Sequence, residues 1–153
     1  MPTRITNDQQ MREALNNLTP QQQRELGGLY VSNVSHLSTD SRIRRALEVA
    51  SKADSSATEL EEVYKSVKAF ATQSYTACGS DADWGAQAEH FVAAAAAACL
   101  APQEHSATIS NNAWKSAMQA RMAKNCEMIL NDTGEIANEA EQQYQIAEKF
   151  LNP

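Results

Sequence analysis

The segment from residue 91 to residue 100 constrains the fold of this chain more than any other part of its sequence. It consists of Phe-Val, six alanines, Cys and Leu, and it carries no charged side chain. A helix that is apolar on all sides belongs in the interior of a protein, so we expect the other helices to pack around this one. The run is shorter than the roughly 20 apolar residues that a bilayer-spanning helix needs. It therefore predicts a central core helix and not a membrane span.

Length and charge limit the class of protein further. A chain of 153 residues with 42% hydrophobic residues is long enough for one domain, residues 1–153, with a substantial core. The net charge of −6 comes without a continuous basic stripe, which argues against nucleic-acid binding. The segment from Met1 to Met11 does not look like a secretion signal, so we expect a cytoplasmic protein without membrane attachment. Three widely spaced cysteines, Cys78, Cys99 and Cys126, are expected to be reduced and semi-buried.

Capping residues and apolar residues at steps of three and four predict seven helices and no strand. The expected helices run from the Thr6 cap to about Leu15, from Pro20 to about His36, from Asp40 after the Thr39 cap to about Ala53, from the Ser56 cap to Cys78, from Ser80 or Asp81 to the stop at Pro102, from Ser110 or Asn111 to about Leu130, and from Thr133 to Leu151. Their expected inward faces include Leu29, Tyr75, Trp84 and Met122. The chain is thus predicted to be all-α, with about seven antiparallel helices in a compact bundle or orthogonal array around the alanine-rich helix.

Two neighbouring glycines, Gly27 and Gly28, lie inside the expected second helix. Each costs on the order of 1 kcal/mol there relative to alanine. One explanation is a close helix crossing, because a backbone without side chains lets another helix approach, and we pair this patch with the alanine run. The other explanation is a local kink.

The expected third helix carries charges of alternating sign at four-residue steps, namely Asp40, Arg44, Glu48 and Lys52. Such pairs form a solvated ladder in which each contributes about 0.2–0.5 kcal/mol. Arg42 and Arg45 lie beside this ladder and outside its pairing. Because arginine makes bidentate contacts with carboxylates, these two residues are candidates for binding a partner protein. The alternative is a solvated helix face, since exposed ion pairs indicate little.

The histidines do not predict a metal site. His36, His90 and His105 are spread over a helix end, a helix and a loop, without a second ligand at the spacing that zinc needs. His36 and Asp40 are four residues apart, but the expected helix break at residues 38–39 separates them. We therefore expect no bound metal.

His90 is the histidine with a second interpretation. It lies among alanines on the side of its helix away from Trp84 and Phe91, where small neighbours leave room for a notch. Such a notch, with Tyr75, Trp84 and His90 around it, could form a pocket for a small ligand. The alternative is a core or half-exposed histidine that a backbone carbonyl satisfies.

No constellation in the sequence predicts catalysis. Cys99 is flanked by alanine and leucine, and Cys126 has only Lys124 and Asn125 beside it, so neither thiol looks activated. Carboxylates cluster on polar faces or in first turns, at residues 61–62, 135, 139 and 141. A glycine-rich phosphate loop, a GxSxG elbow and an HExxH helix are all missing from the sequence. We therefore expect a protein that is not an enzyme, needs no cofactor and presents a surface to a partner protein.

The segment from Asp40 to Ala50 reads DSRIRRALEVA and resembles the D-x-R-x-R-x-A-I-E-x-A segment of an all-helical family of proposed immunity proteins encoded beside bacterial polymorphic toxins. The alanine-rich helices that follow are similar in texture to that family, and the likeness covers about residues 21–100. Ile43 stands where a proline is common in the family, and the last two helices carry no matching motif. The resemblance implies a bacterial cytosolic protein that binds and blocks a toxin, with Asp40, Arg42 and Arg45 as the matched positions. These are our candidate partner-binding residues, and the alternative is that they hold the helix in place.

Three functions from different classes remain open. The first is an immunity or antitoxin-like protein that occludes a toxin, and a toxin-like reading frame directly upstream of the gene would favour it. The second is a phage- or host-encoded inhibitor or adaptor that binds another macromolecule. The third is an undetected enzyme or ligand-binding bundle with a buried cavity beside a perturbed histidine. Self-association is a further possibility, because the face with Trp114, Met118 and Met122 suits a homo-oligomer seam as well as a core.

Overall fold

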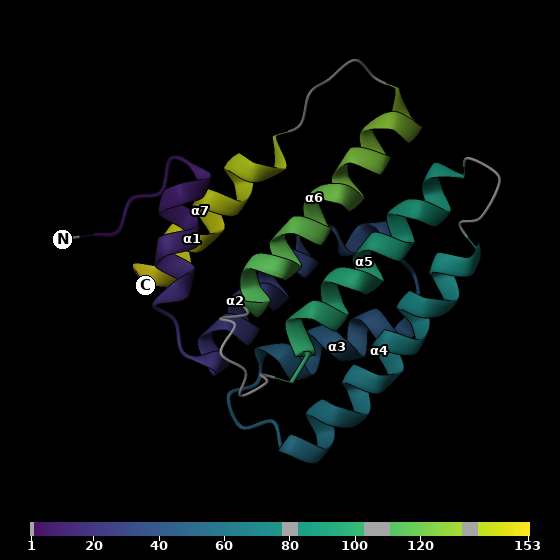
Figure 1. Ribbon diagram of the computed structural model, residues 1–153, viewed down its shortest axis with the longest axis horizontal. Coiled ribbons are helices and arrows are strands. Elements are labelled where there is room, and N and C mark those ends of the chain that lie inside the picture. The colour runs from purple at the N-terminus through teal and green to yellow at the C-terminus, as the bar shows by residue number, and fades with distance from the viewer. Residues whose placement is uncertain (1, 78–82, 103–110, 133–137) are drawn as a thin grey trace.

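The computed structural model describes residues 2–77, 83–102, 111–132 and 138–153, and within these ranges the regular structure is entirely helical (Figure 1). The elements are α1 (Asp8–Asn16), α2 (Pro20–Ser32), the 3-10 helix η1 (Ser35–Leu37), α3 (Ser41–Ser51), α4 (Ala57–Ala77), α5 (Trp84–Leu100), α6 (Asn112–Asn131) and α7 (Glu139–Leu151). The predicted all-α class with seven α-helices is confirmed for the described part of the chain. None of its helices has the length and apolar character needed to cross a bilayer.

Capping residues explain where most of these helices begin. The Thr19 side chain and that of Gln22 form the predicted capping box, and Ser56 Oγ accepts the Glu59 N–H at 3.0 Å. Two caps lie one residue later than predicted. Asn7 caps α1 in place of Thr6, and Asp40 caps α3 in place of Thr39, because these amide and carboxylate oxygens accept the backbone N–H groups of the first turn.

Some predicted positions lie outside the described residues. These are both alternative starts of the fifth helix, the earlier alternative start of the sixth and the start of the seventh, together with Cys78, His105, Glu135, Ile136 and Ala137. Within the described residues, the Asp83 carboxylate caps α5 by accepting the Ala86 N–H, and Asn138 caps α7 by accepting the Glu141 N–H.

The alanine-rich helix α5 lies at the centre of the array, as predicted. It packs against α2, α3, α4 and α6, and in Figure 1 it lies between α4 and α6. Val92, Ala93 and Ala95 are fully buried. Against α6 the contact uses small side chains, and Ser116 Oγ donates to the Ala95 carbonyl at 2.8 Å. Because these side chains are short, α5 and α6 approach each other closely.

The two glycines of α2 lie at close helix crossings. A Cβ atom on Gly27 would lie 3.3 Å from Cys99 Sγ and 3.5 Å from Ser116 Cβ. One on Gly28 would lie 3.0 Å from Ala50 Cβ. Because an added Cβ atom at either position would meet a neighbouring helix closely, the contacts favour the crossing as the reason for both glycines. The prediction that both glycines pack against the alanine run is correct for Gly27, which faces the end of that run, and wrong for Gly28, which faces α3.

A second core lies where α1 and α7 cover α2 and α6. Its buried residues include Met11, Leu15, Leu26, Tyr30 and Ala147. In Figure 1, α1 and α7 lie together on one side of the array. The two ends of the chain also meet there, because the Asn152 side-chain amide accepts the Thr3 N–H and donates to the Thr3 carbonyl, both at 2.9 Å.

Three residues predicted to point inward are exposed, namely Leu29 at 45%, Tyr75 at 71% and Met122 at 44%. Each belongs to a run of apolar residues at helical spacing, but its side chain lies just outside the part of the helix surface that is buried. In α2 the buried arc includes Gly27 and Gly28, because the crossing helices approach there, and this leaves Leu29 outside. In α6 the buried side is likewise the one with small side chains, namely Ser116 and several alanines, and Met122 lies outside it.

Candidate functional site

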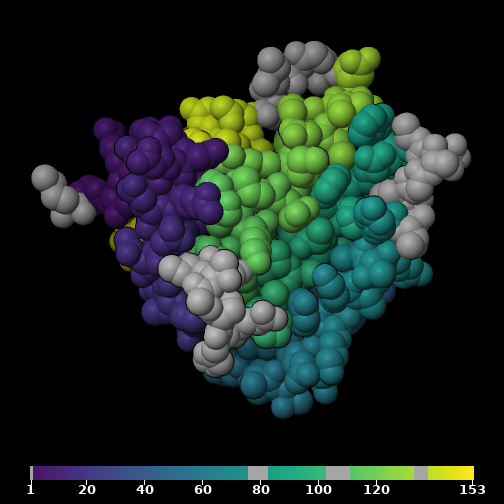
Figure 2. All heavy atoms as spheres, viewed as in Figure 1, coloured from purple at the N-terminus to yellow at the C-terminus, as the bar shows by residue number. Residues whose placement is uncertain are grey.

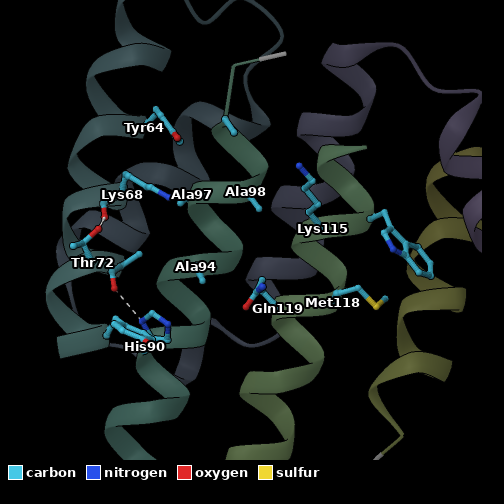
Figure 3. Close-up of a pocket in the computed structure, with 14 residues that line it drawn as sticks. Tyr64, Lys68, Thr72, His90, Ala94, Ala97, Ala98, Lys115, Met118 and Gln119 are labelled. Atoms are coloured by element: carbon cyan, nitrogen blue, oxygen red, sulfur yellow. Dashed lines mark hydrogen bonds between the residues drawn. The ribbon is translucent and has the colours of Figure 1, made fainter. Parts of the chain in front are cut away.

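A groove of about 770 Å³ runs along α5 between α4 and α6 on the surface of the described structure. It opens on the face shown in Figure 2, and Figure 3 shows the residues around it. Its floor consists of the alanines at positions 94, 97, 98 and 101. These side chains end at Cβ, while the flanking helices carry longer ones. The groove is therefore a direct consequence of the alanine run.

One wall of the groove is the exposed edge of α4. Its lining residues recur at helical spacing, namely Tyr64, Lys68, Ala71, Thr72 and Tyr75. From Tyr64 to Tyr75 the helix rises by about 16 Å, which sets the length of the wall. The Thr72 hydroxyl donates to the Lys68 carbonyl at 3.0 Å, so α4 itself satisfies it.

The opposite wall is formed by Trp114, Lys115, Met118 and Gln119 of α6. Figure 3 shows the Met118 side chain directed away from the alanine floor. Trp114 and Met118 pack against the second core, and the Arg12 guanidinium lies 5.2 Å from the centroid of the Trp114 ring. Lys115 and Gln119 remain to provide the polar part of this wall.

The groove is basic in a chain that is acidic overall. The chain has 19 acidic and 13 basic residues, yet the described lining residues include Lys68 and Lys115 and no carboxylate. In Figure 3, Lys68 extends from α4 over the groove, and Lys115 rises from the α6 wall. Neither lysine forms an ion pair with a residue in the described ranges. Both ammonium groups are thus available to an acidic partner.

His90 closes one end of the groove. Its Nδ1 lies 3.0 Å from both the Ala71 carbonyl and Ser74 Oγ. Because a carbonyl only accepts hydrogen bonds, Nδ1 carries the hydrogen and donates it. Burial lowers the pKa of His90, which favours the neutral ring. The interpretation of His90 as a half-buried histidine satisfied by a backbone carbonyl is confirmed.

The predicted pocket of Tyr75, Trp84 and His90 forms only in part. The rings of Tyr75 and His90 lie together, with centroids 5.6 Å apart, and both line the groove. Trp84 is not among the described lining residues, and the tryptophan at the groove is Trp114. Trp84 occupies the first position of α5, almost two turns before His90, which separates it from the alanine floor.

Asp40 and Arg42 contact each other. The Arg42 guanidinium donates from Nε and Nη2 to the two Asp40 oxygens at 2.9 and 2.8 Å, and it lies 4.3 Å from the centroid of the Phe70 ring. The guanidinium holds the pKa of Asp40 below its usual value. Through these contacts, Arg42 connects the start of α3 to α4.

Arg45 is paired as well. Its guanidinium donates to Glu59 at the start of α4, at 2.8 Å, and to Glu48 at 3.4 Å. The predicted ladder, with Arg42 and Arg45 outside its pairing, is therefore wrong. As the N-cap, Asp40 lies outside the helix, and its side chain bends back over the first turn, where Arg42 can reach it.

Other candidate groups lie outside the groove or have partners. Cys99 Sγ donates to the Arg24 carbonyl at 3.1 Å, and burial raises the pKa of Cys99 to about 12. Cys99 is therefore a thiol at neutral pH, and a thiol is a poor nucleophile. His36 contacts Glu127 and not Asp40. Among the described residues, no three His, Cys, Asp or Glu side chains are grouped so as to hold a metal ion.

Sequence reasoning missed most of the groove-lining residues. The spacing of Tyr64, Lys68, Thr72 and Tyr75 marks one face of a helix, but that face alone does not indicate a neighbour. The alanine run was expected to be the centre of the array with at most a notch beside His90, whereas Ala94, Ala98 and Ala101 are half-buried along a groove. The sequence feature that could have indicated the groove is the recurrence of these alanines at steps of three and four, which places small side chains on one side of the helix.

No protein-family model matches this chain, and neither a curated protein nor a solved structure matches it.

Proposed function

We propose that this protein is a protein-binding domain without catalytic activity that receives a segment of a partner protein in the groove between α4 and α6. The observation that carries the proposal is the open alanine floor between two longer walls, edged by two lysines that form no ion pair with a described residue. Such a surface combines apolar contact area with charge complementarity, and helical domains commonly recognise partners through grooves of this kind.

The polar groups around the groove support binding in preference to chemistry. Backbone carbonyls engage the His90 Nδ1 hydrogen and the Thr72 hydroxyl. A hydroxyl nucleophile needs a neighbouring base to take its hydrogen, whereas the Thr72 hydroxyl donates that hydrogen to the Lys68 carbonyl of its own helix. In this arrangement they stabilise the walls and leave the floor as the contact surface.

A toxin is the partner that the family resemblance supports. Neutralisation would follow if the bound segment belonged to a toxin and the helical surface covered the active site of that toxin. Arg42 and Arg45 hold α3 against α4 within the chain, so we propose that the groove makes the main contact. An inhibitor or adaptor for another macromolecule would use the same surface.

Site-directed photo-cross-linking in the source cell tests the site. The photoreactive amino acid p-benzoylphenylalanine replaces Thr72 or Gln119 in the groove, and it replaces Glu62, an exposed residue of α4 away from the groove, as the control. We expect the same partner adduct from both groove positions and none from position 62. An adduct at position 62 alone, or equal adducts at all three positions, would contradict the proposal.

The toxin assignment has its own test. A toxin-like product of a neighbouring reading frame is co-expressed with the wild type, with Ala98→Phe, which fills the groove, or with Ala69→Phe, an exposed position of α4 that does not line it. We expect wild type and Ala69→Phe to restore growth and Ala98→Phe to fail. Growth inhibition that persists with wild type would exclude that product as the partner.

A further inference from the structure

Resting on the proposed function, we propose that the segment bound in the groove is an amphipathic α-helix of about three turns with carboxylates on its flanks. The length follows from the α4 wall, because about 16 Å corresponds to roughly eleven helical residues.

The alanine floor favours a helix over an extended segment. An extended peptide carries backbone N–H and C=O groups that need partners when they leave water. The floor is the apolar side of α5, whose backbone groups before the last turn are paired within the helix. Of the polar side chains nearby, Thr72 and His90 are already bonded to carbonyls. A helix satisfies its own backbone, so it can enter this groove without leaving groups unpaired.

Small side chains on the floor also set how deep the partner lies. Helix axes approach to about 8–10 Å, with the shorter distances where the side chains at the contact are small. Ala94 and Ala98 lie along one line of α5, and Ala101, three residues later, is the C-cap that follows it. A partner helix with apolar residues at positions i, i+4 and i+7 could place them along this line, with Tyr64 and Tyr75 near the two ends.

The two lysines determine the charge of the flanks. Lys68 reaches the groove from α4 and Lys115 from α6, so the two cations lie on opposite walls (Figure 3). A helix between them would meet an ammonium group on each side of its apolar face. Lysine stems can cover apolar surface while their charged ends stay in water, which suits carboxylates at the boundary of the buried stripe. These contacts steer association and weaken with salt.

A peptide library tests this inference before the partner is identified. Random peptides of about 16 residues, long enough for a helix that fills the groove, are displayed on phage and selected on the intact protein. Selected clones are then measured against Lys68→Glu/Lys115→Glu and against Lys52→Glu/Lys149→Glu, a control with the same change in net charge at exposed positions outside the groove. Ala98→Phe and Ala69→Phe form the second matched pair. Circular dichroism verifies that all four variants remain folded.

We expect enriched peptides with a net negative charge and apolar residues at i, i+3 or i+4, and i+7. Their binding should fall about tenfold or more with the groove lysine variant, equivalent to about 1.4 kcal/mol, and change little with the control. Groove-dependent peptides that are basic, proline-rich or without helical periodicity would overturn this inference and leave the proposed function standing. If no enriched peptide depends on the groove, or if the protein instead dimerises through it, both would fall.

Discussion

Replacing Gly28 with alanine tests how closely α2 and α3 are packed. The added Cβ atom would lie 3.0 Å from Ala50 Cβ, a distance at which one of the two backbones has to move. In a helix interior without close neighbours, replacing glycine with alanine would stabilise the folded protein by about 1 kcal/mol. Overpacking in a core costs about 1–3 kcal/mol. The net expectation is a loss of about 1 kcal/mol, or about 2–4 °C in melting temperature for a chain of this size.

A double-mutant cycle isolates the contact. Ala50→Gly removes the atom that the new Cβ would meet, so in that background Gly28→Ala should stabilise by about 1 kcal/mol. The coupling energy between the two sites is then about 2 kcal/mol, well above the additivity error for independent sites. Urea unfolding followed by circular dichroism at the helical band measures all four corners of the cycle.

Gly85 supplies the control. Its added Cβ would lie 3.4 Å from Asp83 Oδ1 and 3.9 Å from Leu130 Cδ2, which are ordinary contact distances. Gly85→Ala should therefore stabilise by about 0.5 kcal/mol. If Gly28→Ala stabilised as much as Gly85→Ala, with zero coupling to Ala50, the close crossing would be refuted. Replacing Gly27 and Gly28 together by leucine should cost about 3 kcal/mol or more.

Three further substitutions test contacts around the groove and the second core. Arg42→Lys keeps the charge but loses the bidentate contact with Asp40 and the stacking on Phe70. Urea unfolding should show a decrease of about 1 kcal/mol in the free energy of unfolding, and an unchanged value would contradict the role given to Arg42. Burial lowers the pKa of His90 below its unfolded value, so wild type should lose stability as pH falls from about 7 to 5, and His90→Gln should flatten this slope. Burial raises the pKa of Glu139, whose Oε2 has no hydrogen-bond partner among the described residues, so wild type loses stability as pH rises above about 4. Glu139→Gln should then be more stable than wild type at pH 7 by about 1 kcal/mol and equal to it near pH 4, and a variant less stable at pH 7 would contradict this.

The helices could be predicted because their signals are local. The Thr19–Gln22 capping box and the Ser56 cap lie within one turn of the backbone groups that they satisfy. The central position of α5 also followed from its own composition, since a helix without charged side chains between residues 91 and 100 belongs in a core. Where two adjacent residues could cap, as at Thr39 and Asp40, the sequence did not decide between them.

The groove could not be predicted in the same way because it depends on which helices become neighbours. Lys68 and Lys115 are 47 positions apart in the chain and meet only because α4 and α6 flank the same helix. The roles of Arg42 and Arg45 were also set by a neighbour, since Phe70 and Glu59 belong to α4. Tyr75, Trp84 and His90 were candidates for one pocket, and of these three the rings of Tyr75 and His90 lie together on the neighbouring helices α4 and α5.

The most direct test of the groove as a binding site is the affinity of the cross-linked partner for three forms of this protein, measured by isothermal titration calorimetry. Wild type is compared with Ala98→Phe, which fills the groove, and with Ala69→Phe, which adds the same ring to an exposed position outside it. We expect Ala98→Phe to weaken binding by about tenfold or more and Ala69→Phe to leave it within about twofold of wild type. Equal affinity of the partner for all three forms would contradict the claim that the groove is the binding site.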